Sequence, residues 1–480
     1  MAAYSAARSA VDAGMDIQVT VLEKMPRPGR KIMITGKGRC NFTNVKPWNE
    51  FSGHIRSKSN FIKSAFYSLP PEKVVDFFEK FGCGTVVERG DRAFPVSYHA
   101  SDIVDTLVNA CLSVGVKIET EFEVAEIHTG QPSSKTAESR SANRSSVPAG
   151  SQSNGFDIAG RDEGGQKTAG AFEILSADGR KYLCQRLIIA TGGLSYPGTG
   201  STGDGYGWAR EMGHSIVPTF PSLTALVPKG YKDPEGIISE FKFHIDRSSP
   251  RTEFGDKLCG IQLKNVGAAL FVEGTEAGNE FGDIDFTDGG IEGPIGFQLS
   301  RKAVKSLVNG SKVALSIDLK PGVGLTEVTE RVKALWSEID KDPRSRRLRE
   351  KERCRVLLGK LMPWELIPAF TAANPGIITL ERRGRADTKV WVNLVTIAKA
   401  LKDWRFEIAG FVGYERAVVT AGGVSTDELI AKTMESRIVE GLYFCGEVLD
   451  VDADTGGYNL QAAFATGSLA GTNAAKSLNQ

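Results

Sequence analysis

Several features that would mark a function class are missing from this 480-residue chain. No apolar run approaches the roughly 18 residues that span a bilayer, and the net charge is only +1, so neither a membrane span nor a polyanion-binding field is indicated. The seven cysteines form no C-x-x-C pair and the five histidines show no metal-ligand spacing. We therefore expect a reduced, cytoplasmic protein with no disulfide framework, no bound metal and no membrane partner.

The N-terminus lacks the first half of a dinucleotide-binding unit. Residues 1–13 carry small residues at helical spacing, Gly14 follows as a cap, and apolar residues alternate from Ile17 up to Glu23. This order of a helix, a glycine and a strand that ends in an acidic residue is typical of the second half of a βαβ unit. The strand and the G-x-G-x-x-G motif that should precede it are absent. Two alternatives stay open, a transit peptide (which Asp12 disfavours) and a plain surface helix.

What the chain has in excess is glycine, with 53 residues against a usual share of about 7%. The glycines cluster in the loop 29–44 (GRKIMITGKGRCNFTN) and between 192 and 213, a stretch with eight glycines that begins at the end of the apolar strand expected at 187–193. Such loops let backbone approach a ligand closely, although tight or flexible turns would also explain them.

The C-terminal segment carries the clearest pattern. An apolar strand is expected at 442–445, and Gly446-Glu447 follows at its carboxyl end, where α/β sheets place ligands. Gly456-Gly457 then precedes the helix expected from Tyr458, whose N-terminus would stabilise negative charge. An ordinary structural helix is the alternative.

Together these segments resemble the HI0933-like flavoproteins, a group that includes bacterial aminoacetone oxidase and a bile-acid reductase. The matching motifs run in the family's order over nearly the whole chain: GRKIMITGKGRCNFTN (29–44), FPVSYHASDIVDTL (94–107), LIIATGGLSYPGTGSTGDGYGWARE (187–211), FTDGGIEGP (286–294), and AVVTAGGVSTDEL with GLYFCGEVLDVDADTGGYNLQAAFATG (417–467).

The resemblance implies an α/β fold, a Rossmann-like FAD-binding domain of the two-dinucleotide-binding-domain flavoprotein type with an inserted, mainly β plus helical domain. It places Glu23 at the adenosine ribose and Val124 by the adenine, and it implies Tyr196, Tyr458 and Cys40 as catalytic candidates, although each could equally be packing. The implied cofactor-binding residues are Glu23, Lys24, Arg30, Lys31, Gly36, Gly38, Arg39, Cys40, Asn41, Thr43, Val124, Thr191, Gly192, Gly193, Gly446, Glu447, Asp450, Gly456, Gly457, Tyr458, Asn459 and Gln461.

The expected domain boundaries lie where the pattern of strands and charged helices along the sequence changes. We expect an FAD-binding domain over 1–213 and 375–480, interrupted by a substrate-side insert over 214–374 with an antiparallel barrel or sandwich and charged helices. Residues 129–171 are rich in Ser, Gly and Ala, which predicts a disordered insertion within the strand pair EVAEIHT and FEILSADG. Because the family begins with the missing strand and glycine loop, we also expect Met1 to be an internal methionine.

The functional expectation is an FAD-dependent oxidoreductase that takes a hydride from a small-molecule substrate or NAD(P)H. Eight Lys or Arg against two Glu between 344 and 360 could bind RNA. Such a run is more often a solvated helix face, and no aromatic residues are interleaved, so no nucleic-acid partner is expected. The alternatives are a flavin-binding or RNA-associated module without turnover, and an N-terminally truncated form impaired in FAD binding.

Overall fold

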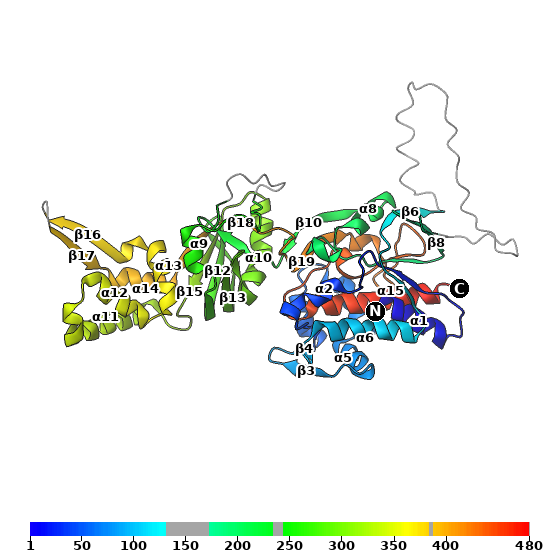
Figure 1. Ribbon diagram of the computed structural model, residues 1–480, viewed down its shortest axis with the longest axis horizontal. Coiled ribbons are helices and arrows are strands. Elements are labelled where there is room, and N and C mark those ends of the chain that lie inside the picture. The colour runs from blue at the N-terminus through cyan, green and yellow to red at the C-terminus, as the bar shows by residue number, and fades with distance from the viewer. Residues whose placement is uncertain (131–171, 234–242, 384–386, 480) are drawn as a thin grey trace, which may run out of the picture. The chain divides into compact units, whose positions relative to one another are not determined.

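The structure is a computed structural model that describes residues 1–130, 172–233, 243–383 and 387–479 (Figure 1). It separates into two units, unit 1 with Met1–Phe220 and Val419–Gln480, and unit 2 with Pro221–Val418. The insert therefore ends at Val418 and not at 374 as the sequence predicted, because a late strand, β18 (Trp404–Phe411), is needed to close its barrel. Most of the predicted 129–171 insertion lies outside the described residues.

Unit 1 alternates short strands with helices. Its elements are α1 (Ala2–Asp12), β1 (Thr20–Leu22), α2 (Arg30–Met33), η1 (Thr35–Gly38), β2 (Thr43–Asn44), α3 (Trp48–Phe51), η2 (Ser52–His54), α4 (Ser59–Ser68), α5 (Pro71–Lys80), β3 (Thr85–Glu88), β4 (Arg92–Pro95), α6 (Ala100–Ser113), β5 (Lys117–Glu119), β6 (Val124–Thr129), β7 (Phe172–Ser176), β8 (Lys181–Cys184), β9 (Leu187–Ile189), η3 (Pro197–Thr199), α8 (Asp204–Glu211), β10 (Ile216–Ser222), β19 (Val419–Val424), η7 (Thr426–Glu428), β20 (Leu442–Phe444), η8 (Gly446–Val448) and α15 (Tyr458–Lys476).

Two parallel strand pairs form the α/β part of unit 1. β1 pairs with β5, with Val21 opposite Ile118, and β9 pairs with β20, with Ile188 opposite Tyr443. No described strand joins the two pairs. The predicted antiparallel pair is present as β6 and β7, extended by β8, and β2, β4 and β3 form a further small sheet.

The long C-terminal helix α15 packs against the N-terminal helix α1. The small residues predicted to give α1 a close-packing face are buried, among them Ala6, Ala7 and Ala10, and Gly14 takes the left-handed conformation expected of a cap (φ +65°). The contact is close enough that a Cβ added at Gly471 would lie 2.0 Å from the carbonyl oxygen of Ala2. This packing fixes the axis of the helix whose other end reaches the predicted site.

Unit 2 combines a barrel with helices, in line with the expected barrel or sandwich and charged helices, and it adds a hairpin that the sequence did not predict. Its elements are β11 (Leu226–Pro228), α9 (Glu253–Leu258), β12 (Gln262–Val272), β13 (Thr275–Thr287), β14 (Gly290–Glu292), α10 (Gly293–Val308), β15 (Val313–Asp318), α11 (Leu325–Lys341), η4 (Pro343–Arg347), α12 (Glu350–Gly359), η5 (Trp364–Leu366), α13 (Ile367–Ala373), η6 (Pro375–Ile377), β16 (Ile378–Arg383), β17 (Asp387–Val392), α14 (Leu394–Lys402) and β18. The closed barrel has the order β11-β14-β13-β12-β15-β18, and apolar side chains such as Leu315 and Trp404 are fully buried.

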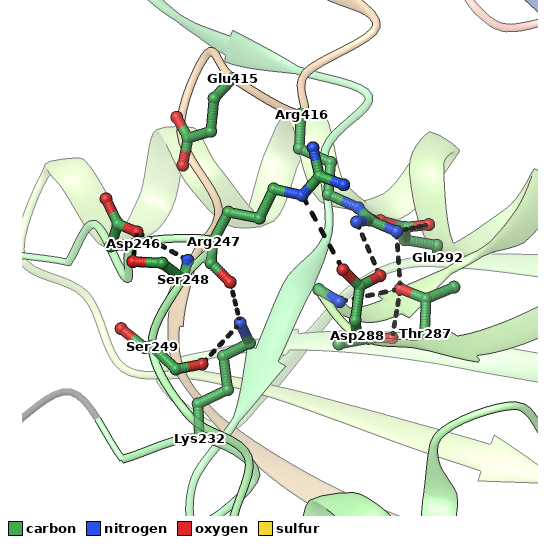
Figure 2. A network of polar contacts seen from close by, with 12 residues as sticks. Lys232, Asp246, Arg247, Ser248, Ser249, Thr287, Asp288, Glu292, Glu415 and Arg416 are labelled. Atoms are coloured by element: carbon green, nitrogen blue, oxygen red, sulfur yellow. Dashed lines mark hydrogen bonds and ion pairs between the residues drawn. The ribbon is translucent and has the colours of Figure 1, made fainter.

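A polar network ties the segment after β18 to the barrel (Figure 2). The Arg416 guanidinium pairs with Asp288 at 2.7 Å and with the carboxylate of Glu292, which is itself largely buried. Lys232 is buried nearby, and its ammonium donates to the carbonyl oxygens of Arg247 (2.7 Å) and Ser249 (3.1 Å). Arg416 is paired with two carboxylates and the Lys232 ammonium is hydrogen-bonded to two carbonyl oxygens, so we interpret the network as structural.

One ion pair at this network makes stability depend on pH. His244 Nε2 lies 3.2 Å from Glu415 Oε1, and this hydrogen bond raises the pKa of His244. Burial alone would raise the pKa of Glu415, but hydrogen bonds from His244 and the backbone outweigh it and leave that pKa lowered. The His244 contribution is complete below its unfolded pKa of about 6.5 and fades as pH rises through the raised value, while that of Glu415 is lost in acid.

We therefore expect His244→Gln to lower the thermal unfolding midpoint more at about pH 6 than at about pH 8.5, where the wild-type imidazole is already losing its proton. Circular dichroism melts of both proteins at the two pH values measure the difference. An equal loss at both values would mean that the imidazole contributes only by packing.

Among the described residues, no helix combines the length and the hydropathy needed to cross a bilayer. The same residues contain no group of three or more His, Cys, Asp or Glu side chains arranged to hold a metal ion.

Candidate functional site

Two parallel strands of unit 1 end at one edge, and the predicted site begins there. β9 is followed by Thr191, Gly192 and Gly193, and β20 is followed after Cys445 by Gly446 and Glu447. The amide of Gly446 donates to Thr466 Oγ1 of α15 at 3.0 Å, which holds the strand end against the helix. Carboxyl ends of neighbouring parallel strands are where α/β folds bind ligands.

Glu447 links three segments at this edge. Its carboxylate accepts a hydrogen bond from the backbone amide of Thr420 at 2.8 Å and pairs with the ammonium of Lys31 on α2. Both side chains are about one-fifth exposed (24% for Lys31 and 19% for Glu447), so the pair is shielded but still reachable. The family resemblance had placed both Lys31 and Glu447 among the cofactor-binding residues. In the structure the two side chains are in direct contact.

Thr420 on β19 is a site residue that the sequence did not identify. Its hydroxyl oxygen accepts the backbone amides of Leu194 (2.8 Å) and Ser195 (3.1 Å) and contacts Ser195 Oγ at 3.0 Å. It also lies so close to Gly193 that an added Cβ there would be 2.5 Å away. One buried hydroxyl thus fixes the conformation of the glycine-rich loop after β9.

The loop 41–44 lies against the N-terminus of α15. Asn44 Nδ2 donates to the carbonyl of Gly456 at 3.1 Å, and Thr43 Oγ1 donates to Gln461 Oε1 at 2.6 Å. Gly457 has φ +94°, and a Cβ added there would lie 2.4 Å from Thr43 O. No side chain caps α15, so the amides of its first turn face this region without a capping oxygen.

Two buried polar atoms in these loops have no hydrogen-bond partner within the described part of the chain. They are Asn41 Oδ1, beside Gly457, and Thr191 Oγ1, just after β9. Leaving a buried acceptor or hydroxyl unsatisfied costs about 1–3 kcal/mol, so a ligand that supplies the missing partners would be stabilised here. A flavin fits this requirement, because its isoalloxazine carries both an N–H group and carbonyl oxygens.

The residues predicted for the adenosine side are arranged around the end of β1. Glu23 Oε1 accepts the Met25 amide at 2.8 Å, and burial raises the pKa of Glu23 although Arg30 and Lys24 oppose the shift. Lys24 donates to Thr202 (2.7 Å) and pairs with Asp204 (2.9 Å), which ties the β1 end to the glycine-rich stretch. Val124, at the start of β6, packs against the main core of unit 1.

Arg39 points toward neighbouring aromatic residues. Its guanidinium pairs with Glu88 at 2.8 Å and lies 4.7 and 4.4 Å from the ring centres of Phe94 and Tyr98. The preceding glycines Gly36 and Gly38 have φ +56° and +89°, as expected of a tight loop. Arg39 is thus held by the β3–β4 surface in this structure.

The three catalytic candidates lie in different environments. Cys40 is fully buried in a cluster with Phe42 and Phe78, and burial raises its pKa to about 11, so its thiol stays protonated. Tyr458 is buried with its pKa raised to about 12 by burial, and its ring stacks on His54 at 4.3 Å. Tyr196 is half-buried, has φ +54°, and begins the turn η3 after β9.

Buried acids organise the segment before α15. Asp454 pairs with His54 Nδ1 at 3.0 Å and with the Arg56 guanidinium, while Asn459 Oδ1 accepts the Ala453 amide at 2.9 Å. Asp450 is also buried, and its amide donates to Val424 O at 3.0 Å. The resemblance named Asp450 and Asn459 but not His54, Arg56 or Asp454. Of these three, only Asp454 had a local signal, the repeated acid in D-V-D-A-D.

Comparison with known proteins shows which family the chain belongs to. The family model of the HI0933-like protein Rossmann domain matches residues 1–155 and 156–473. The chain is 30% identical to a 3-dehydro-bile acid delta(4,6)-reductase of Clostridium scindens, over 99% of this chain and 96% of the relative. It is 29% identical to a ribosomal RNA dihydrouridine synthase of Escherichia coli, over 94% and 90%. A solved 3-ketosteroid delta1-dehydrogenase from Sterolibacterium denitrificans aligns with 12% identity over 99% of this chain and 97% of that chain, with a TM-score of 0.44.

Proposed function

Because the chain belongs to the HI0933-like family of Rossmann-domain proteins, we propose that it is an FAD-dependent reductase of carbon–carbon double bonds conjugated to a carbonyl group. The observation that carries the cofactor assignment is the pair of unpartnered buried atoms, Asn41 Oδ1 just before β2 and Thr191 Oγ1 just after β9.

Residues of unit 1 are assigned to the cofactor by their position. Glu23 would bind the ribose hydroxyls at the end of β1, with Lys24 and Arg30 near it. Asn41 and Thr191 would hydrogen-bond the polar edge of the isoalloxazine, and the uncapped N-terminus of α15 would stabilise negative charge there. Bound FAD supplies two-electron hydride chemistry at its N5 atom.

The substrate class comes from what two relatives have in common. A delta(4,6)-reductase of a 3-dehydro bile acid and a dihydrouridine synthase are named for different molecules. Both names describe saturation of a carbon–carbon double bond in conjugation with a carbonyl. The net reaction adds a hydride to the far carbon and a proton to the carbon next to the carbonyl, with NAD(P)H as the proposed electron donor.

The chain's own residues set the proton and charge environment. The Lys31–Glu447 pair keeps one positive and one negative charge at the strand edge. Tyr196 is retained as the candidate proton donor, because it is half-buried in the loop after β9. Cys40 is reassigned to packing, since its thiol is fully buried and its pKa is raised to about 11.

Anaerobic turnover tests the proposal. The FAD-loaded protein is incubated with NADH or NADPH and either a 4,6-dien-3-one steroid or a uridine-rich RNA, and products are analysed by mass spectrometry. We expect one substrate to gain two hydrogens, and its saturated analogue to stay unchanged. Stable bound flavin that no donor reduces would contradict the proposal in favour of a binding module, and O₂ consumption without saturation of any double bond would indicate an oxidase.

A further inference from the structure

The charged helical part of unit 2 has a strongly basic surface. Between 344 and 360 it carries eight Lys or Arg and two Glu. The neighbouring acids are already paired with two of these cations: Asp342 binds Arg344 at 3.3 Å, and Asp340 and Glu350 both lie near Arg353, at 3.1 and 3.5 Å. Lys360 also pairs with an acid, Glu338, at 3.9 Å.

Five exposed cations of this run have no ion pair among the described residues: Arg346, Arg347, Arg349, Lys351 and Arg355. Arg346 and Arg347 lie on η4, and Lys351 and Arg355 lie one turn apart on α12, so the latter two share a helix face. α12 is anchored in unit 2, because its Leu357 and Leu358 are fully buried. The two side chains on α12 thus project from a rigid support.

An exposed aromatic ring lies beside these cations. Trp364 on η5 is 50% exposed, and the Arg355 guanidinium lies 5.7 Å from its ring centre. The ring packs directly on Gly359, where an added Cβ would lie 2.5 Å from the ring. The sequence showed no interleaved aromatic residue because Trp364 follows the basic run, but folding brings it alongside.

We propose that this basic face, defined by Arg346, Arg347, Lys351, Arg355 and Trp364, binds RNA through phosphate contacts and base stacking. Unpaired guanidinium and ammonium groups match a phosphate backbone, and an exposed indole offers a stacking platform that every base can use. An anionic membrane fits less well, because the apolar residues of α12 are buried in unit 2 and leave no apolar face to insert.

Of the two substrates considered for the proposed reaction, an RNA and a free small molecule, this proposal favours the RNA. To that extent it rests on the proposed function. Binding is measured without turnover, so the two can fail separately. A chain that binds RNA but saturates no double bond would overturn the proposed reaction alone. If the chain reduces a free dienone but binds no RNA, only the RNA-binding role of the basic face is overturned.

Fluorescence anisotropy with a labelled, short uridine-rich RNA hairpin at several salt concentrations tests the basic face. The triple variant Arg346→Glu, Arg347→Glu, Lys351→Glu should weaken binding at least about tenfold and reduce the salt slope by about 2, because three phosphate contacts of about 0.7 each are lost. Trp364→Ala should weaken binding about fivefold or more through lost stacking.

The matched control changes the same charge elsewhere. Lys63, Lys73 and Lys80 are exposed lysines on α4 and α5 of unit 1, and their triple replacement by Glu should leave affinity within about twofold. A glutamine version of the basic-face triple, with an unchanged thermal midpoint, excludes unfolding as the cause. The proposal is wrong if the wild type shows no saturable RNA binding, if the two glutamate triples behave alike, or if polyglutamate or phosphatidylserine vesicles bind better than RNA.

Discussion

Gly457→Ala is expected to abolish tight FAD binding. Gly457 has φ +94°, a conformation that costs a non-glycine residue roughly 1–2 kcal/mol. An added Cβ would lie 2.4 Å from the Thr43 carbonyl oxygen and 2.8 Å from Asn41 Oδ1, distances that force the 41–43 loop away from α15. Because that loop carries the unpartnered Asn41 oxygen, we expect FAD affinity to fall by about a hundredfold or more, equivalent to about 3 kcal/mol.

Gly179→Ala is the matched control for this substitution. Gly179, in the turn after β7, has nearly the same φ (+90°), but no atom lies within 4 Å of the position its Cβ would take. The control isolates backbone strain from the clash, and it should cost about 1 kcal/mol of stability without changing FAD affinity. Flavin fluorescence titration of both variants measures the difference, and equal affinities would show that the 41–43 loop does not form part of the cofactor site.

Gly471→Ala is expected to destabilise unit 1 by about 2–4 kcal/mol, because the new methyl group would force the α1 and α15 backbones apart. Its Cβ would lie 2.0 Å from Ala2 O and 3.0 Å from Ala6 N, which are backbone atoms that cannot rotate away. The intrinsic gain of about 1 kcal/mol from replacing a helical glycine by alanine is too small to offset this clash.

Gly467, one turn earlier on α15, gives the control. The nearest atom to an added Cβ there is Ala2 N at 3.4 Å, an ordinary contact, so Gly467→Ala should be neutral or slightly stabilising. Urea unfolding followed by circular dichroism compares the two variants. If both alanines shift the curve equally, the helices do not pack as closely as the structure shows.

Local patterns in the sequence predicted much of the fold because they report local physics. The small-residue face of α1, the strand before Glu23, the β9 and β20 strands and the barrel are all present. Periodicity could not reveal that β18 closes the barrel with β11 and β15, since that pairing joins distant segments. The predicted end of the insert was early for this reason.

The site was predicted as a set of loops, but its contacts were not. Thr420 holds Leu194 across 226 positions of sequence, and no local feature marks it. Arg39 and Cys40 were placed at the cofactor by resemblance, whereas the structure holds Arg39 against Glu88 and buries the Cys40 thiol among phenylalanines. Which way a loop side chain points depends on neighbours that only tertiary structure supplies.

The most direct test of the account is a titration of the purified wild-type chain with FAD, followed by flavin fluorescence and absorbance. The proposed cofactor site lies in unit 1, where Asn41 Oδ1 and Thr191 Oγ1 have no hydrogen-bond partner among the described residues. We predict that binding saturates at one FAD per chain and perturbs the flavin spectrum. The substitution Asn41→Leu should weaken this binding. The assignment of this site would be contradicted if the wild-type chain takes up no FAD, or if the Asn41→Leu variant binds FAD as tightly as the wild type does.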